Sequence, residues 1–256
     1  MFSEKPKGDM RGGNIVSRDA LDLIKECVVE RLPKFEDLPA TIKIDSDLQL
    51  CDEAVGDFEH FGGEGINLLG VSQELEDLHD DYGVEFSCSV VADHEGNLTL
   101  GPIIQGDEDS VQLHAPLKRR EMITSSGLTV YRDDAIVAAV HTHGDESSFS
   151  LADIYAQFSG NNGSLRQIYV VRRSGVIDMA HLSADSALLN PESFRRLIDL
   201  WGSYLDHEGM FREGLSEDEY NEFIRRILNE TLKIGFYTNE GSDDPAVLVK
   251  KGGSKK

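Results

Sequence analysis

The sequence predicts an α/β protein in which a mixed or antiparallel sheet is flanked by helices, with extra helices at both ends of the chain. Two observations support this class. Segments rich in β-branched and aromatic residues, separated by turns, occupy residues 84–104 and 129–182. A single helical pattern that starts at Ser150 interrupts them, so three strands, one helix and two strands follow one another. Such an order is typical of a layered α/β domain.

The N-terminal part of the chain is expected to form an extension. Residues 1–16 predict a flexible terminus. Ser17 is a suitable N-cap for a helix, because the apolar residues that follow have helical spacing. These residues are Leu21, Ile24, Val28 and Leu32. The stretch from about Pro33 to Tyr82 is acidic and broken by glycines, and it predicts loops with short elements. Residues 17–83 are therefore interpreted as a helical or irregular extension that packs on the core.

The predicted core, residues 84–190, begins with a β-hairpin. VEFSCSVVAD and LTLGPII flank the turn HEGN, which contains glycine. The apolar run Ala135–Val140 suits a buried strand, and SLADIYAQFSG predicts a helix that ends at Gly160. Two more strands are expected on either side of the turn at Ser174 and Gly175.

Residues 191–249 are predicted to form C-terminal helices and one possible last strand. PESFRRLIDLWGSYL places its apolar residues on one face. The next helical pattern, SEDEYNEFIRRILNETLK, opens at Ser216 with three acids in its first turn, a favourable arrangement for the helix dipole. IGFYTNEG suits a short strand, and the lysine- and glycine-rich residues 250–256 suggest a flexible tail.

Charge and cysteine content narrow the class of partners and the compartment. The formal net charge of -22 argues against binding to nucleic acid or to an anionic membrane, which both require a basic surface. Cys27, Cys51 and Cys88 form no CxxC pair, which fits reduced thiols in the cytoplasm. The first residues lack the apolar region of a signal peptide. We therefore expect a cytoplasmic protein, although secretion without a cleaved signal would leave no trace in the sequence.

Four residues in AIVAAVHTHGDESSFSLADI are candidates for a metal site. His141 and His143 are two apart, so both side chains of an extended segment point to one face. Asp153 lies in the first turn of the next predicted helix, close enough to fold back over the strand end. Two imidazoles and a carboxylate leave one position of a catalytic zinc ion open for water. Ser150 could donate its hydroxyl to that water or to a substrate oxygen.

A structural interpretation of the same residues is also possible. Ser150 and Asp153 have the spacing of a helix capping box, and histidines at a strand end can simply face solvent. Because one serine oxygen can cap the helix and also contact a ligand, the two interpretations are partly compatible.

The spacing of these residues resembles the motif of the JAMM (JAB1/MPN) metalloprotease superfamily, His-x-His followed by a linker and Ser-x-x-Asp. The apolar strand before the motif and the YVVRRSG segment after it are also similar to bacterial JAB-type domains. The resemblance spans roughly Val84 to His181 and implies a JAB1/MPN-like fold with zinc on His141, His143 and Asp153. The family usually has seven linker residues and a proline after the second histidine. This chain has six, 144–149, and Gly144 in the proline's place, where glycine permits an alternative turn.

The resemblance also implies a glutamate on an early strand that acts as the general base. Glu85 in YGVEFSCSVV is the best candidate, because an acid stands out there among strand-forming residues. Glu95, in a predicted turn, and Glu121, in a predicted connector, remain competitors. The other histidines are isolated and are interpreted as structural or exposed: His60, His79, His94, His114, His181 and His207.

These observations predict a zinc-dependent peptidase or isopeptidase of JAMM type, with a protein or peptide as its substrate. Glu85 would move the proton of the attacking water, and Ser150 would contact that water or the oxyanion. Two alternatives stay open. One is a non-catalytic JAB1/MPN-like interaction scaffold, and the other is a toxin-type effector peptidase delivered to other cells. The sequence leaves the oligomeric state and the type of bond undecided.

Overall fold

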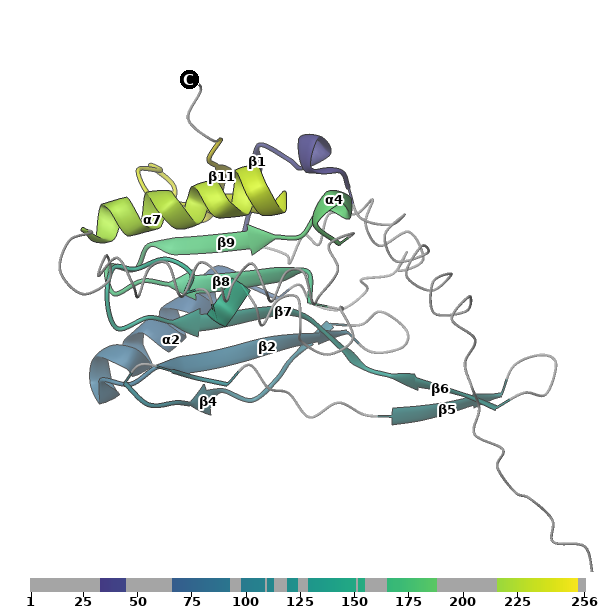
Figure 1. The fold of residues 1–256 in the computed structure, drawn as a ribbon. Coiled ribbons are helices and arrows are strands. Elements are labelled where there is room, and N and C mark those ends of the chain that lie inside the picture. Colours follow the sequence, from purple (N-terminus) through teal and green to yellow (C-terminus); the bar gives the residue numbers. More distant parts are fainter. Residues whose placement is uncertain are drawn as a thin grey trace, which may run out of the picture.

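The computed structural model describes residues 33–44, 66–92, 98–108, 110–112, 119–123, 129–150, 152–154, 165–187 and 216–252, and for 119–123 and 129–133 it describes the backbone. Figure 1 shows the fold. The elements are η1 (Phe35–Asp37), β1 (Thr41–Lys43), α2 (Leu68–Tyr82), β2 (Phe86–Ala92), β3 (Leu98–Leu100), β4 (Ile104–Gln105), β5 (Arg119–Ile123), β6 (Thr129–Asp133), β7 (Ala135–Thr142), β8 (Gln167–Val171), β9 (Ile177–His181), α4 (Ala184–Ala187), α7 (Glu217–Arg226), the π-helical segment η4 (Ile227–Leu232), β10 (Gly235–Thr238) and β11 (Val247–Lys250).

A nine-stranded sheet forms the centre of the described structure. Its strands lie in the order β1-β11-β10-β9-β8-β7-β2-β3, and β4 also pairs with β2. Only β7 and β8 run parallel to each other, and the other neighbouring strands in this sheet are antiparallel. The predicted α/β class with a mixed sheet is therefore confirmed. β5 and β6 form a separate two-stranded sheet that extends away from the main one in Figure 1.

Strands from the predicted N-terminal extension, the predicted core and the predicted C-terminal segment join this one sheet. β1 belongs to segment 17–83, β10 belongs to segment 191–249, and β11 begins in that segment and ends at Lys250, the first residue of the predicted tail. β11 pairs with both β1 and β10, and β10 pairs with β9 of the predicted core. The last strand expected in IGFYTNEG is thus confirmed as β10, whereas β11 was not expected. The division into five segments itself stays a prediction.

The expectation of loops with short elements between Pro33 and Tyr82 agrees with η1 and β1, but it is wrong for Leu68–Tyr82, because α2 is a helix of 15 residues. Asn67 caps its first turn by accepting a hydrogen bond from the Gly70 backbone N–H at 2.9 Å. Gly83 ends the helix with φ of 68°, a left-handed conformation that glycine adopts without a steric penalty. The glycine inside the first turn and the many acidic residues concealed this helix in the sequence.

Each face of the sheet carries its own hydrophobic core. Alternate residues of β8 point to opposite faces, as a strand requires: Tyr169 packs in one core and Ile168 in the other. The first core includes Leu75 of α2, so α2 covers that face. The second includes Phe149 of the linker and Ile224 of α7, so the linker and α7 lie on the opposite face. This arrangement brings α2 and the linker to the same end of the sheet from opposite sides.

Several other predictions can be compared with the described residues. The hairpin of β2 and β3 is confirmed, with Val90 opposite Leu100. The buried strand at 135–140 is confirmed as β7, and the pair β8 and β9 surrounds a turn in which Gly175 has φ of 75°. Ser216 and Glu219 form a capping box at the start of α7. Of the helix expected from Ser150, residues 152–154 are helical, and the predicted helices at 17–32 and 191–205 lie outside the described residues.

Within the described part of the chain, no helix is long and apolar enough to cross a membrane.

Candidate metal centre

The candidate site lies at the end of the main sheet where the parallel strands β7 and β8 finish together. His141 is the second-last residue of β7 and pairs with Ser87 of β2. His143 follows the strand, and its backbone N–H donates to the Val171 carbonyl at 2.9 Å. The carboxyl ends of parallel strands are a frequent position for ligand sites in α/β proteins. The strand therefore delivers both imidazoles to one place, as the spacing predicted.

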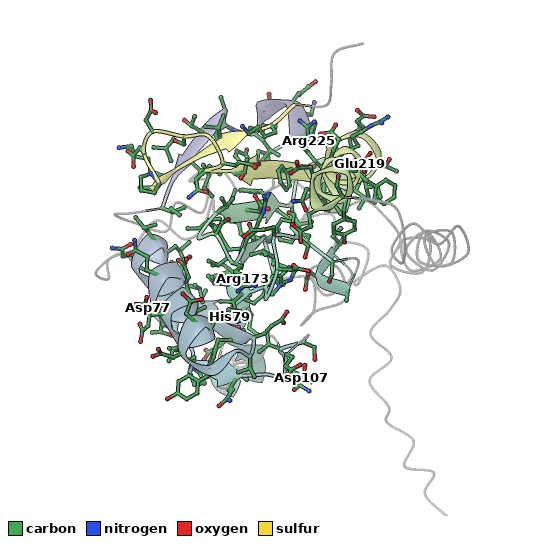
Figure 2. The ribbon with its side chains drawn as sticks, turned by 90° about the vertical axis from the view of Figure 1, so that its left-hand side faces the viewer. Asp77, His79, Asp107, Arg173, Glu219 and Arg225 are labelled. Carbon is green, nitrogen blue, oxygen red and sulfur yellow. The ribbon has the colours of Figure 1, made fainter. Side chains whose placement is uncertain are left out.

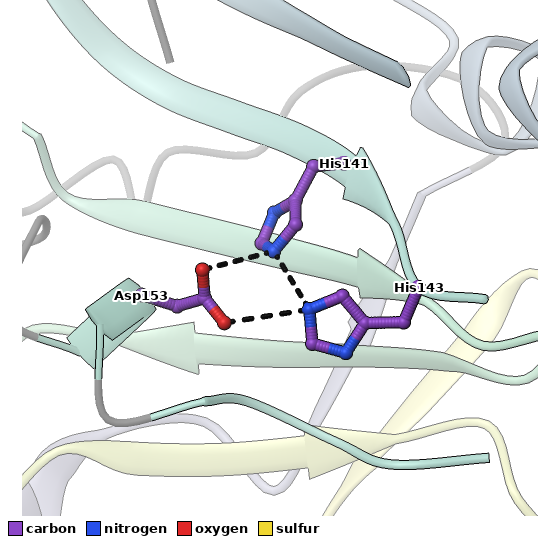
Figure 3. Close-up of side chains that lie close together, drawn as sticks. All are labelled: His141, His143 and Asp153. Atoms are coloured by element: carbon purple, nitrogen blue, oxygen red, sulfur yellow. Dashed lines mark hydrogen bonds and ion pairs between the residues drawn. The ribbon is translucent and has the colours of Figure 1, made fainter. Parts of the chain in front are cut away.

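The two imidazoles and the Asp153 carboxylate converge (Figure 3). His141 Nε2 lies 3.1 Å from Asp153 Oδ1, and His143 Nε2 lies 3.4 Å from Asp153 Oδ2. The two Nε2 atoms are 3.2 Å apart. One possible ligand atom from each residue lies within 4.8 Å of the other two. The three residues predicted from the sequence thus form a group that is compatible with a metal ion.

One histidine is oriented by a second contact. His143 Nδ1 lies 3.2 Å from the Ser147 carbonyl oxygen, which can only accept, so Nδ1 carries the hydrogen. In the neutral ring, Nε2 then has the lone pair, and it faces Asp153 and His141. Ligating histidines in metal sites are usually held by a hydrogen bond of this kind. His141 Nδ1 is buried, and no described residue forms a hydrogen bond with it.

Ser150 is tied to the Asp153 carboxylate. Its hydroxyl and its backbone N–H both donate to Asp153 Oδ2, each at 2.7 Å. The Asp153 N–H donates back to Ser150 Oγ at 3.1 Å. This reciprocal arrangement is a capping box, so the structural interpretation of these two residues holds. The capping box also orients Asp153 toward the histidines, and Ser150 lines one cavity together with these three residues. Its predicted contact with a water or an oxyanion stays a prediction.

Electrostatics at the site favour an ionised carboxylate beside positive charge. Burial alone would lower the pKa of His143, but Asp153, the Glu85 charge and the Ser147 carbonyl raise this pKa above its ordinary value. Burial alone would raise the pKa of Asp153, but His141 and His143 outweigh that effect and hold it well below its usual range. These are the surroundings in which a bound cation would be stabilised.

The short linker 144–149 is held by α7, which lies outside the predicted core, residues 84–190. Asn221 accepts a hydrogen bond from the Ser148 N–H at 2.7 Å and donates to the Glu146 carbonyl at 2.9 Å. The neighbouring Tyr220 hydroxyl donates to the Phe149 carbonyl at 2.9 Å. Burial, followed by the charges of Asp153 and Asp145, raises the pKa of Tyr220, so this hydroxyl stays protonated and able to donate.

The turn between β8 and β9 holds the other side of the linker. The Arg173 N–H donates to the Asp145 carbonyl at 3.1 Å, and the Ser174 hydroxyl donates to Glu146 Oε2 at 2.6 Å. Gly144 is not among the described glycines with positive φ, so the shorter linker does not depend on a backbone conformation reserved for glycine. Contacts with α7 and with this turn, rather than freedom at Gly144, fix the path of the linker.

Glu85 and the metal-binding group line one cavity of about 670 Å³. Glu85 is buried, and its backbone pairs on both sides with the loop after β4: its N–H donates to the Asp107 carbonyl, and its carbonyl accepts from Gly106. The Phe86 N–H donates to Thr142 Oγ1 at 3.0 Å, which brings Glu85 level with His143. The cavity therefore contains all five predicted site residues.

The two competing glutamates are not brought to this cavity by any described contact. Glu95 lies outside the described residues. Glu121 lies in β5 and not in a connector, and β5 pairs with β6 in the separate sheet.

The cavity also contains residues that the sequence did not single out for function. His79 and Asp80 come from the end of α2, Glu108 from the loop after β4, and Arg173 from the turn after β8. The expectation that His79 is structural or exposed stays a prediction, because its ring lines the cavity and its Nδ1 also lies 2.8 Å from the Val84 carbonyl oxygen. His181, in contrast, is buried, and its Nδ1 lies 2.7 Å from the Leu182 carbonyl oxygen, in keeping with a structural role. The signal for His79 was weak, since nothing in the sequence places α2 beside the linker.

No known protein family matches the chain, and no curated protein matches it significantly.

Proposed function

We propose that this protein is a zinc-dependent peptidase or isopeptidase of JAMM type. The observation that carries the proposal is the convergence of His141, His143 and Asp153 in one cavity with a buried glutamate, Glu85. A metal-binding group alone is also compatible with a structural ion. The additional acid beside it supplies what hydrolysis needs, a group that can accept and return a proton.

The donor set fits zinc. Two imidazole nitrogens and one carboxylate oxygen are three ligands of the type that catalytic zinc sites use, with a fourth position left open. His141 and His143 offer Nε2 atoms 3.2 Å apart, and Asp153 offers an oxygen to each. When bound, zinc supplies Lewis acidity, which lowers the pKa of a coordinated water and polarises a carbonyl group.

The remaining steps fall to side chains of this chain. Glu85 would take a proton from the attacking water on its carboxylate and would pass it to the leaving nitrogen. Burial suits this role, because a carboxylate shielded from solvent exchanges its proton within the site. Ser150 would keep Asp153 aligned through its backbone N–H, which donates to Asp153 Oδ2, and its hydroxyl would turn from the carboxylate to donate to the oxyanion.

Replacement of Glu85 separates metal binding from catalysis. The Glu85→Gln protein is expected to retain one equivalent of zinc and to lose hydrolysis by at least about a hundredfold, since general acid–base catalysis contributes 10²–10⁴ in rate. Zinc content and the rate of hydrolysis are measured together on a panel of protein, peptide and isopeptide substrates that includes fluorescein-labelled casein.

Asp80→Asn provides a matched control, because Asp80 is an exposed acid that lines the same cavity and has no role in the proposed mechanism. This variant should keep both zinc and hydrolysis. A wild-type protein that binds zinc and cleaves no member of the panel would instead favour the non-catalytic scaffold. Activity retained in Glu85→Gln would contradict the role of Glu85.

A further inference from the structure

A pair of hydrogen-bond acceptors lies beside the metal-binding group, in the same cavity. His79 stands near the end of α2, and Figure 2 shows its position on that helix. Its Nδ1 lies 2.8 Å from the Val84 carbonyl oxygen. A carbonyl oxygen can only accept, so Nδ1 carries the hydrogen and, in the neutral ring, Nε2 carries a lone pair. No described residue forms a hydrogen bond with Nε2.

The edge of the His79 ring that carries Nε2 faces Gly144. A Cβ atom at position 144 would lie 3.5 Å from His79 Cε1, 3.8 Å from His79 Nε2 and 3.7 Å from the Glu108 carbonyl oxygen. Two acceptor atoms from separate elements, α2 and the loop after β4, therefore border the space that a side chain at position 144 would occupy. Gly144 directly follows His143, so this space adjoins the metal-binding group.

The chemistry of this space defines what it can bind. A space bordered by two acceptors favours a hydrogen-bond donor that enters it and disfavours another acceptor. Peptides carry such donors as backbone amides and as lysine or arginine side chains. The absence of a side chain at Gly144 leaves room for the donor to approach both acceptors.

We propose that His79 Nε2 and the Glu108 carbonyl form a subsite that binds an N–H group of the substrate next to the scissile bond. His79 is then a substrate-binding residue and Gly144 a specificity-determining one. This inference rests on the proposed peptidase function and deepens it, because it states which substrate atom the cavity recognises.

Three variants test the subsite without touching the predicted metal ligands. His79→Asn keeps a donor for the Val84 carbonyl, since its amide nitrogen takes the place of Nδ1, but it removes the acceptor at Nε2. His79→Gln can place an amide oxygen where Nε2 stood. Gly144→Ala fills the space. The alanine should fold normally, because no contact of its Cβ would be shorter than 3.5 Å and φ at this position is not left-handed.

The substrate probe is fluorescein-labelled casein, followed by the most rapidly cleaved peptide isolated from the casein digest. His79→Asn and Gly144→Ala are expected to raise KM for this peptide roughly three- to tenfold, the effect of one lost hydrogen bond, with kcat and zinc content unchanged. His79→Gln should recover part of the loss. A merely structural role for His79 would not be rescued in this way.

Modified peptides identify the donor. The casein peptide is synthesised with each backbone amide N-methylated in turn, and separately with lysine replaced by norleucine. One modification should raise KM for the wild type and have no further effect on His79→Asn. The modification that does so distinguishes a backbone amide from a side-chain amine.

Failure of the subsite differs from failure of the proposed function. A wild type that cleaves casein while His79→Asn shows the same KM, and the same response to every modified peptide, would overturn the subsite alone. A zinc-loaded wild type that cleaves neither casein nor its peptides would overturn the peptidase function and the subsite with it.

Discussion

Asn221 of α7 and Ser148 of the linker are joined by a hydrogen bond of 2.7 Å across 73 positions of sequence. The same amide side chain donates to the carbonyl of Glu146. A helix outside the predicted core thereby holds the loop between His143 and Ser150. The position of the aspartate relative to the histidines depends on this loop.

Removal of the Asn221 side chain should weaken metal binding. Asn221→Ala leaves the Ser148 N–H and the Glu146 carbonyl without these partners, so the linker loses its fixed path. We expect zinc affinity to fall roughly tenfold or more, the usual effect of removing a residue whose hydrogen bonds orient the metal ligands. Competition with a fluorescent zinc chelator measures this affinity.

Asn239 offers a matched control for this experiment. It also holds two backbone groups, accepting from Ile177 N–H and donating to the Pro245 carbonyl, but it does not line the metal cavity. Asn239→Ala should therefore lower stability while zinc affinity stays at the wild-type value. Equal zinc affinities of Asn221→Ala and Asn239→Ala would contradict the role given to α7.

Replacement of Ser150 should affect both the local fold and the metal site. Ser150→Ala removes the hydroxyl that donates to Asp153 Oδ2 and accepts from its N–H. We expect a loss of about 1 kcal/mol in the free energy of unfolding, typical of a lost N-cap, together with weaker zinc binding. Denaturant unfolding of the zinc-free protein and zinc competition report the two effects. Ser150→Thr keeps the hydroxyl oxygen and should restore both stability and zinc affinity. A Ser150→Ala protein with the stability and zinc affinity of the wild type would contradict the role of the capping box.

A buried ion pair close to the site should contribute strongly to stability. Asp178 is fully buried, and both Nε and Nη2 of Arg172 contact its Oδ2, at 2.8 and 2.7 Å. Asp178→Ala would leave the guanidinium buried without this partner, so we expect a loss of about 3–5 kcal/mol in urea unfolding. Glu222→Ala removes the more exposed pair with Arg225 and should cost less than about 1 kcal/mol. Similar losses in the two variants would be inconsistent with this account.

Stability should fall as the solution is acidified, because His181 is buried. Burial lowers its pKa from 6.5 to about 4. The unfolded chain therefore binds a proton on this residue between pH 6.5 and 4, while the folded chain does not. This contribution to stability is complete above pH 6.5 and is lost progressively down to pH 4, by about 3 kcal/mol in total.

The pH dependence can be assigned to His181 by comparison with a variant that does not titrate. Unfolding free energies of wild type and His181→Gln are measured in urea with a chelator present at several pH values from 7.5 to 4. The difference between the two proteins should narrow as the pH falls. A constant difference across this range would contradict the assignment.

The parts of the site that were predictable are those encoded over short distances. The spacing of His141 and His143 places both rings on one side of any extended segment, and Ser150 and Asp153 form a local box. The apolar run Ala135–Val140 before them is typical of a buried strand, and it forms β7. These features need no knowledge of the remaining chain, and the structure bears out their geometry.

The parts that were missed depend on contacts between distant segments. In the sequence, Asn221 is a polar residue of a helix like many others. Only its hydrogen bond to the linker gives it a role in holding the site. His79 belongs to α2, a helix that was not predicted because Gly70 and the acidic residues are atypical of a helix that packs on a core. β1 joins the sheet through β11, and a pairing between residues about 200 positions apart leaves no local pattern. Nothing in the sequence alone could bring these elements together.

Metal content tests the central claim most directly. Protein produced in zinc-supplemented medium and purified without chelator is analysed by inductively coupled plasma mass spectrometry, beside His141→Ala, His143→Ala and Asp153→Ala. The convergence of these residues predicts about one zinc per wild-type chain, in keeping with a three-ligand site, and a large loss of zinc in each variant. A folded wild type without stoichiometric zinc, or variants that retain it, would contradict the account.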